Sequence, residues 1–286
     1  DIDPITYNLC PKALKKKLIK AKELKILPKI VIPVHLSGQS CDMKAIYELS
    51  KEYGFKIIED ASHAIGGKYL NKPIGNCEYS DIAVFSFHPV KIITTGEGGV
   101  ALTNNSELSD RMSLLHSHGT TRDLKKMTHE PDGDWYYQQI DLGFNYRMTD
   151  IQAALGISQL DRLDEYVSRR HDFALRYNEL LKDLPLIIPY QHKDVYSSFH
   201  LYIIRLKNEK KHKKVFRFLR KKGIFVNLHY IPVHTHPYYQ KTKVEFMDLN
   251  HSEDYYKNAI TLPLYPSMTE QQQDIVVSSL IEALDS

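Results

Sequence analysis

The 286-residue sequence is poor in cysteine and contains no long apolar run. Its three cysteines, Cys10, Cys41 and Cys77, lie far apart and show neither metal-ligand spacing nor a disulfide framework. This usage is typical of a reducing compartment, so we predict a cytoplasmic location. No apolar run approaches the length of a membrane span, and DIDPITYNLC has no basic segment followed by an apolar one. We therefore expect neither a visible secretion signal nor membrane insertion.

The sequence also lacks a strong excess of charge of either sign. Its 38 basic and 35 acidic residues give a net charge of +3, which requires neither nucleic acid nor an anionic membrane as a partner. Two basic runs, residues 12–25 and 207–222, are candidate polyanion sites, but their apolar periodicity favours solvated faces of amphipathic helices. With 42% hydrophobic residues, the composition is that of an ordinary globular protein with one large or two smaller domains.

The first half of the chain alternates strand and helix patterns. Strand patterns fall at residues 29–36, 55–60 and 81–87, and a helix pattern at residues 42–54 begins with Asp42 and ends with Gly54. This order predicts an α/β domain whose parallel strands are joined by crossover helices. In such sheets, ligands gather at the carboxyl ends of the strands. Asp60 and the segment 86–91 are therefore site candidates by position.

The second half predicts a bridge followed by a smaller α+β domain. Residues 148–181 carry two amphipathic helical stretches, which we take as the bridge between domains. The small domain then has strand patterns at 197–206 and 224–231, a helix pattern at 210–223, and a last helix opened by Thr269 with Gln272 as a possible capping box. We place the large domain at residues 1–165 and the bridging helix with the small domain at residues 166–286.

Lys91 follows a strand pattern and precedes the glycine cluster TTGEGG. A lysine amine is ordinarily protonated, with a pKa near about 10.4, but burial and nearby positive charge lower that value and let the amine form a Schiff base with an aldehyde. Asp60 could pair with a protonated pyridine nitrogen, as a pyridoxal phosphate (PLP) enzyme requires. Ser86 could bind the phosphate and His63 could reach or stack on the ring. Each of these residues also has a structural alternative. Asp60 could be a helix cap or an ion-pair partner, Ser86 a core hydroxyl, and His63 a surface or interface histidine whose hydrogen bonds are all made.

Three linked motifs resemble the DegT/DnrJ/EryC1 family of nucleotide-sugar aminotransferases. They are IIEDASHAIGGKY, GNCEYSDIAVFSFHPVKIITTGEGG and LGFNYRMTDIQAALG, in family order and spacing. The resemblance covers the whole chain and implies the fold type I of PLP-dependent transferases, as in aspartate aminotransferase. That fold has a mixed, mostly parallel sheet in its large domain and a smaller α+β C-terminal domain. Family members carry a longer N-terminal portion, with a phosphate-binding turn and a ring that stacks on the cofactor, so we expect this sequence to be a piece of a longer chain.

The resemblance implies cofactor-binding roles at the matching positions. Lys91 would carry PLP, Asp60 would pair with its pyridine nitrogen, and Ser86 would bind its phosphate. Ala61 and His63 would lie beside the ring. Asn145 matches an asparagine that reaches the phosphate across a dimer interface, so a homodimer is expected.

Other positions are implied on the substrate side. They are His88, Arg147, His229, Tyr230 and His234. Arg147 would act at the interface or on an anionic substrate group, with a structural salt bridge as the alternative. The residues of NLHYIPVH would contact the sugar or hold the small domain against the large one. His88 would shape the loop beside the lysine or touch the sugar.

The variant SFHPVKIITTGEGG, together with VNLHYIPVHTHPYY, is most similar to the family branch of pseudaminic acid biosynthesis. This similarity implies transfer of an amino group from glutamate to the 4-keto carbon of a UDP-linked 4-keto-6-deoxy-N-acetylhexosamine. One alternative is a dehydrase of the same fold, but a histidine replaces the lysine in that branch. The other is a non-catalytic PLP-binding or regulatory protein, or an inactive fragment.

Overall fold

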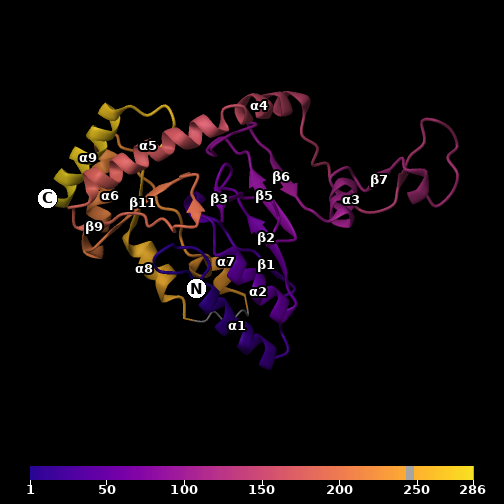
Figure 1. The fold of residues 1–286 in the computed structure, drawn as a ribbon, viewed down its shortest axis with the longest axis horizontal. Helices are drawn as coiled ribbons and strands as arrows, with labels where there is room; N and C mark the ends of the chain where they lie inside the picture. The colour runs from indigo at the N-terminus through magenta and orange to yellow at the C-terminus, as the bar shows by residue number, and fades with distance from the viewer. Residues whose placement is uncertain (243–247, 286) are drawn as a thin grey trace.

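The computed structural model describes residues 1–242 and 248–285, which form two lobes, a long helix between them and a projecting arm (Figure 1). The large lobe is built on a four-stranded sheet in the order β1-β2-β5-β6. Strands β1 (Ile30–Val31), β2 (Lys56–Asp60) and β5 (Ile82–Ser86) run parallel, and β6 (Gly99–Leu102) is antiparallel to β5. The mixed, mostly parallel sheet confirms the predicted α/β fold class.

Helices α1 (Pro11–Glu23) and α2 (Met43–Tyr53) pack together in the large lobe. The Asp42 side chain accepts the N–H of Ala45 at 3.2 Å, and Gly54 ends α2 with a φ of 78°, which confirms both predicted boundaries. A second sheet pairs β3 (Lys68–Tyr69) with β4 (Lys72–Pro73) and with β10 (Val195–Tyr196).

The strand predicted at residues 29–36 is much shorter than its pattern. Regular pairing is confined to β1, and a single parallel bridge joins Val34 to Asp60. Pro33 has no N–H to donate, so the ladder breaks between these two points. Its carbonyl oxygen still accepts the N–H of Asp60 at 2.9 Å, which keeps this segment beside the end of β2.

The arm comprises residues 106–149 and extends away from both lobes (Figure 1). It contains α3 (Ser106–Leu115) and the antiparallel pair β7 (Thr120–Thr121) and β8 (Gln138–Gln139). Helix α4 (Asp150–Leu160) follows the arm and is capped by a Thr149–Gln152 capping box. Within the described part of the chain, no residue of α4 is buried.

Helix α5 (Leu163–Leu181) joins the two lobes. Val167, in its first half, packs with Ile92 and Ile93 of the large lobe. Phe173 and Tyr177, in its second half, belong to the main core of the small lobe. The predicted domain boundary between residues 165 and 166 falls near the start of this helix and stays a prediction.

The small lobe has a three-stranded antiparallel sheet of β9 (Leu186–Ile187), β11 (Tyr202–Leu206) and β12 (Ala259–Leu262). Its helices are α6 (His212–Lys221), the short α7 (Pro237–Gln240), α8 (Asn250–Asn258) and α9 (Glu270–Asp285). On α6, Val215 and Leu219 are buried, so the second basic run does form an amphipathic helix. The Thr269–Gln272 capping box that opens α9 is confirmed by hydrogen bonds of 2.9 and 3.2 Å.

The strand predicted at residues 224–231 is wrong apart from one bridge, between Asn227 and Thr261. After Asn227 the chain leaves the sheet edge, because side chains bind His229 instead of a backbone partner. The Thr261 hydroxyl lies 2.8 Å from the Nδ1 atom of His229. The Tyr255 hydroxyl donates to the His229 carbonyl oxygen at 2.5 Å. This departure turns residues 229 and 230 toward the large lobe.

Candidate active site

Two neighbouring parallel strands end beside each other and present the first candidate residues. Asp60 ends β2 and Ser86 ends β5, and Asp60 is in register with Val84. The chain then turns, with the N–H of Lys91 bound to the His88 carbonyl oxygen at 2.9 Å. Gly99 faces Ser86 across the sheet, and a Cβ there would lie 2.7 Å from the Phe85 carbonyl oxygen. The glycine therefore permits the close approach of β6 that shapes the lysine loop.

Lys91 is half-buried. Within residues 1–242 and 248–285, its ammonium group forms no hydrogen bond and no ion pair. Burial lowers the pKa of Lys91, and the negative charge of Asp60 opposes this effect. A lowered pKa increases the neutral fraction of the amine near pH 7. Such an amine can act as a nucleophile or accept a proton.

Asp60 offers a free acceptor close to that lysine. One carboxylate oxygen accepts the N–H of Ser62 at 3.1 Å, and this is the one hydrogen bond made by the carboxylate in the described residues. The other oxygen is left for a ligand. Asp60 raises the pKa of both Lys91 and Tyr230, so its charge acts on both side chains.

His63 is 6% exposed, and both of its ring nitrogens are engaged. Its Nδ1 accepts the N–H of Ser37 at 3.3 Å, and its Nε2 lies 3.3 Å from the hydroxyl of Tyr230. Because Nδ1 is an acceptor, the ring proton belongs on Nε2 and is donated to Tyr230. Burial, followed by the charges of Lys91 and His229, lowers the pKa of His63 to about 3. His63 is therefore a neutral hydrogen-bonding group at physiological pH.

His229 and Tyr230 reach the site from the small lobe. Burial and the charge of Lys91 lower the pKa of His229. Burial and the charge of Asp60 raise the pKa of Tyr230, so this phenol stays protonated. The structure thus brings Lys91, Asp60 and His63 together with these two residues, which the sequence had assigned to the substrate side.

His200 also belongs to this cluster, and the sequence reasoning missed it. It is 7% exposed, and its ring centroid lies 4.4 Å from that of His63. Its Nδ1 atom is buried without a hydrogen-bond partner among the described residues. Burial, then the charges of His63 and of Arg170, lowers the pKa of His200 well below its ordinary value. The residue precedes β11 and lies within an apolar strand pattern, so no strand-end position marked it as a site candidate.

The remaining cofactor candidates lie at the ends of the same strands. Ala61 is buried and donates its N–H to the Val84 carbonyl oxygen at 2.9 Å. The Ser86 hydroxyl accepts the N–H of His88 at 3.4 Å. The His88 side chain itself is exposed and lies 3.8 Å from the carboxylate of Glu97.

Three candidates lie apart from the cluster within this chain. Asn145 and Arg147 are exposed on the arm, where Arg147 Nε donates to the Asn145 side chain at 3.1 Å and Nη2 lies 3.2 Å from His118. His234 Nε2 forms a 3.1 Å hydrogen bond with the carboxylate of Glu253 of α8. Both residues belong to the small lobe, so this contact does not join the two lobes, and the role of His234 stays a prediction.

The residues of the cluster fit PLP. A strand-end carboxylate with a free oxygen suits a protonated pyridine nitrogen, and an unpaired, half-buried lysine suits the aldehyde. The orphaned Nδ1 of His200 is a further buried atom able to meet a polar partner. The described residues contain no group of three His, Cys, Asp or Glu side chains placed to hold a metal ion. None of their helices is long and apolar enough to cross a membrane.

Comparison with known proteins decides the family. Residues 1–281 match the DegT/DnrJ/EryC1/StrS aminotransferase family. The chain belongs to this family.

Relatives in the DegT/DnrJ/EryC1/StrS family agree in sequence and in structure. A UDP-4-amino-4,6-dideoxy-N-acetyl-beta-L-altrosamine transaminase of Campylobacter jejuni is 34% identical, over 97% of this chain and 71% of that protein. The structure of Helicobacter pylori PseC, an aminotransferase in the biosynthesis of pseudoaminic acid, matches with a TM-score of 0.88 and 30% identity, over 99% of this chain and 72% of PseC. The PLP form of a putative sugar aminotransferase from Streptococcus pneumoniae matches with a TM-score of 0.85 and 26% identity, over 100% of this chain and 74% of that one.

These comparisons confirm the predicted family and fold. As a DegT/DnrJ/EryC1/StrS aminotransferase, the protein is a PLP-dependent enzyme. The roles of individual residues, the dimer and the cytoplasmic location stay predictions.

Proposed function

We propose that this protein transfers an amino group from glutamate to the 4-keto carbon of a UDP-linked 4-keto-6-deoxy-N-acetylhexosamine, as in pseudaminic acid or related sugar biosynthesis. The observation that carries the proposal is that a half-buried Lys91, with no hydrogen bond or ion pair from the described residues, lies within the electrostatic influence of an Asp60 carboxylate that keeps one oxygen free. The activity named for the C. jejuni relative supports the choice of substrate.

Lys91 has two tasks in this proposal. Its amine holds the cofactor in the resting enzyme, and once released it carries a proton to and from the substrate carbon. Bonding to the cofactor and accepting a proton both need the neutral amine, which the lowered pKa of Lys91 favours, and the proton that it has accepted is the one that it later returns. PLP, when bound, supplies an electron-poor ring that stabilises negative charge on the substrate carbon. Asp60 would hold the protonated ring nitrogen, and Ser86 would hold the phosphate.

His63, His229 and Tyr230 line the site beside Lys91 and Asp60. The neutral His63 orients the Tyr230 hydroxyl, whose own proton is then free for a sugar or cofactor oxygen. His229 is fixed at one nitrogen by Thr261 and presents its other nitrogen as a further polar group. These residues bind and orient, whereas Lys91 moves the proton.

The protein acts as a homodimer in this proposal, with Asn145 of each chain completing the site of its partner. The arm and α4 expose large apolar side chains, among them Trp135 (74% exposed), Leu142 (81%) and Ile151 (85%). Apolar surface of this kind is typical of an interface between chains. Asn145 and Arg147 lie on the same arm and point to no group of the site in their own chain.

The experiment that tests this function has two steps. Borohydride should abolish the visible absorbance of the lysine-bound cofactor in the wild type, and Lys91→Ala should lack that absorbance. Lys182→Ala is the matched control, because Lys182 is exposed and paired with Glu179 at 2.9 Å. Product analysis with glutamate and a panel of UDP-4-keto sugars then identifies the reaction. Normal turnover by Lys91→Ala would refute the role of the lysine, and bound PLP without an aminated product would indicate a binding protein.

A further inference from the structure

A buried histidine–glutamate pair lies directly behind Asp60. His35 is 0% exposed and Glu59 is 5% exposed, and their Nε2 and Oε2 atoms are 2.9 Å apart. The second carboxylate oxygen of Glu59 accepts the hydroxyl of Ser80. Glu59 and Asp60 are successive residues of β2, so their side chains point to opposite faces of the sheet. The pair therefore supports the strand end from the face that the site does not use.

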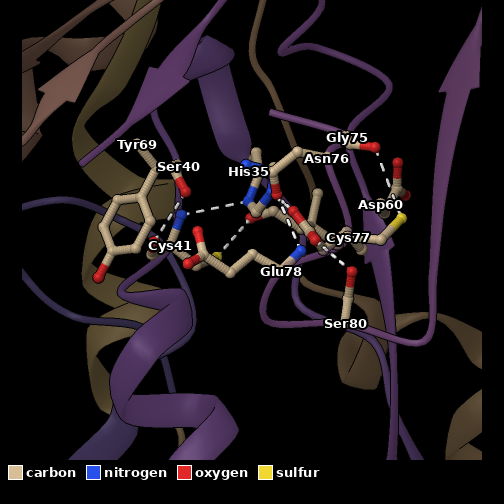
Figure 2. A network of polar contacts seen from close by, with 12 residues as sticks. His35, Ser40, Cys41, Asp60, Tyr69, Gly75, Asn76, Cys77, Glu78 and Ser80 are labelled. Carbon is tan, nitrogen blue, oxygen red and sulfur yellow. Dashed lines mark hydrogen bonds and ion pairs between the residues drawn. The ribbon is translucent and has the colours of Figure 1, made fainter. Parts of the chain in front are cut away.

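The same histidine organises the loop of residues 33–41. The N–H of Cys41 donates to His35 Nδ1 at 3.1 Å, so Nε2 carries the ring proton and donates it to Glu59. Figure 2 shows His35 at the centre of this network, with Cys41 on one side and Ser80 on the other. Both ring nitrogens are used: one binds Cys41 at the end of the loop, and the other binds Glu59 of β2.

This 33–41 loop contacts two residues of the candidate site, Asp60 and His63. The N–H of His35 donates to the Asp60 carbonyl oxygen at 3.0 Å. The N–H of Ser37 donates to His63 Nδ1 at 3.3 Å and thereby sets the tautomer of His63. Gly38 comes so close that a Cβ there would lie 2.9 Å from the His63 carbonyl oxygen. Displacement of the loop would therefore move both Asp60 and His63.

We propose that His35 and Glu59 are positioning residues, which hold Asp60 and His63 in place through the 33–41 loop. This inference rests on the proposed function, because Asp60 and His63 serve the cofactor there. Neither residue of the pair touches the reacting groups. His35 and Glu59 form a buried hydrogen bond with each other, so the loss of either side chain leaves a buried polar group without a partner.

Glu59→Met is the variant that tests the pair, because it keeps an unbranched side chain and removes both hydrogen bonds. Glu59→Gln is the conservative variant, because its amide can still accept from His35 and donate to Ser80. Asp81→Asn is the matched control. Asp81 directly precedes β5, and its carboxylate accepts the N–H of Ile57, near the start of β2 and away from the site, at 2.8 Å.

The first measurement uses the apoprotein and gives the pKa of Lys91 from the pH dependence of its acylation. Since Asp60 raises that pKa, a displaced Asp60 should lower it. We expect Glu59→Met to lower it by roughly half a pH unit or more, and Glu59→Gln and Asp81→Asn to leave it unchanged. The second measurement uses the holoenzyme: Glu59→Met should weaken PLP binding roughly tenfold and shift the pH midpoint of the visible absorbance.

Two outcomes would overturn the inference. In the first, Glu59→Met unfolds at a lower temperature than the wild type and yet keeps the wild-type pKa of Lys91, which would make the pair merely structural. Glu59→Gln could shift that pKa as much as Glu59→Met, which would mean that charge and not position matters. If Glu59→Met does not fold, His35→Gln replaces it, because its amide cannot reach both Glu59 and Cys41. A failure of the proposed function would look different, since the wild type would then lack the borohydride-sensitive absorbance.

Discussion

His63 Nε2 and the Tyr230 hydroxyl lie 3.3 Å apart, and this contact joins the large lobe to the small lobe across the candidate active site. The N–H of Ser37 occupies the other nitrogen of His63, so the histidine is the donor in this contact. Tyr230 then keeps its own proton for another acceptor. This contact is compatible with both alternatives for Tyr230, contact with the sugar and support of the lobes, and the choice between them stays a prediction.

We predict that Tyr230→Phe lowers kcat/KM for the sugar substrate about tenfold, through the loss of one hydrogen bond. Bound PLP should stay at the wild-type level, because Lys91 and Asp60 are unchanged. Steady-state kinetics and cofactor absorbance measure the two effects. Tyr238→Phe, a change at an exposed tyrosine of α7, is the control. An unaltered kcat/KM in Tyr230→Phe would remove Tyr230 from the substrate side.

Asp60→Asn should reduce kcat by about a thousandfold, because an amide cannot keep the ring nitrogen protonated. It should also lower the pKa of Lys91, since the charge of Asp60 raises that pKa in the wild type. Single-turnover kinetics give the first effect, and the pH dependence of lysine acylation in the apoprotein gives the second. A wild-type lysine pKa in this variant would contradict the electrostatic coupling of the two residues.

The free energy of unfolding of the apoprotein should fall as the pH is lowered from 6.5. In the unfolded chain His63 takes up a proton below its ordinary pKa of 6.5, whereas in the folded protein its pKa is about 3. The unfolded state therefore binds more protons in this window and is favoured as the pH falls. At pH 5 the loss from His63 is on the order of 2 kcal/mol. Burial of His200 acts in the same direction.

Urea unfolding of the apoprotein at pH 7 and pH 5 measures this loss. His63→Gln should lose less stability between the two pH values than the wild type, whatever its stability at pH 7. Equal losses in both proteins would mean that His63 is not kept neutral by folding.

Mixing two inactive variants should restore activity if each site needs two chains. In a heterodimer of Lys91→Ala and Asn145→Ala, one site combines both changes and the other combines the two unchanged residues. Random association should therefore give about a quarter of the wild-type activity. Refolding an equal mixture and measuring its turnover is the test, with each variant refolded alone as the control. An inactive mixture that light scattering shows to be dimeric would contradict a shared site.

Much of the fold follows from local signals in the sequence. The Asp42 cap, the Gly54 stop and the Thr269–Gln272 capping box mark helix ends through contacts between near neighbours, and all three are confirmed. The limits of a strand depend on partners that are distant in the sequence. The apolar pattern of residues 224–231 therefore predicted a whole strand where the structure has a single bridge, at Asn227. Phe225 is exposed and Val226 is buried, as in a strand, but no backbone in residues 1–242 or 248–285 forms a β-bridge with the segment beyond Asn227.

The candidate site was predictable where position along a strand carries information. Asp60 and Lys91 follow buried strands, and the parallel sheet brings these strand ends together. His200 and the His35–Glu59 pair were not predictable, because their contacts are made with segments that are distant in the sequence. His35 and Glu59 are 24 residues apart in the sequence, and His63 contacts His200 from another lobe. No local sequence pattern indicates contacts of this kind.

Helix α5 has 19 residues, a span of about 28 Å, and serves as a rigid strut between the lobes. The N-terminal half of α5 packs against Ile92 and Ile93, which directly follow Lys91. Its C-terminal half packs in the core of the small lobe. Midway along it, Arg170 grips the backbone of Phe199 and His200 with hydrogen bonds of 3.2 Å. One continuous helix thus contacts both lobes beside the candidate site, so its stiffness fixes the spacing between the lysine loop and His200.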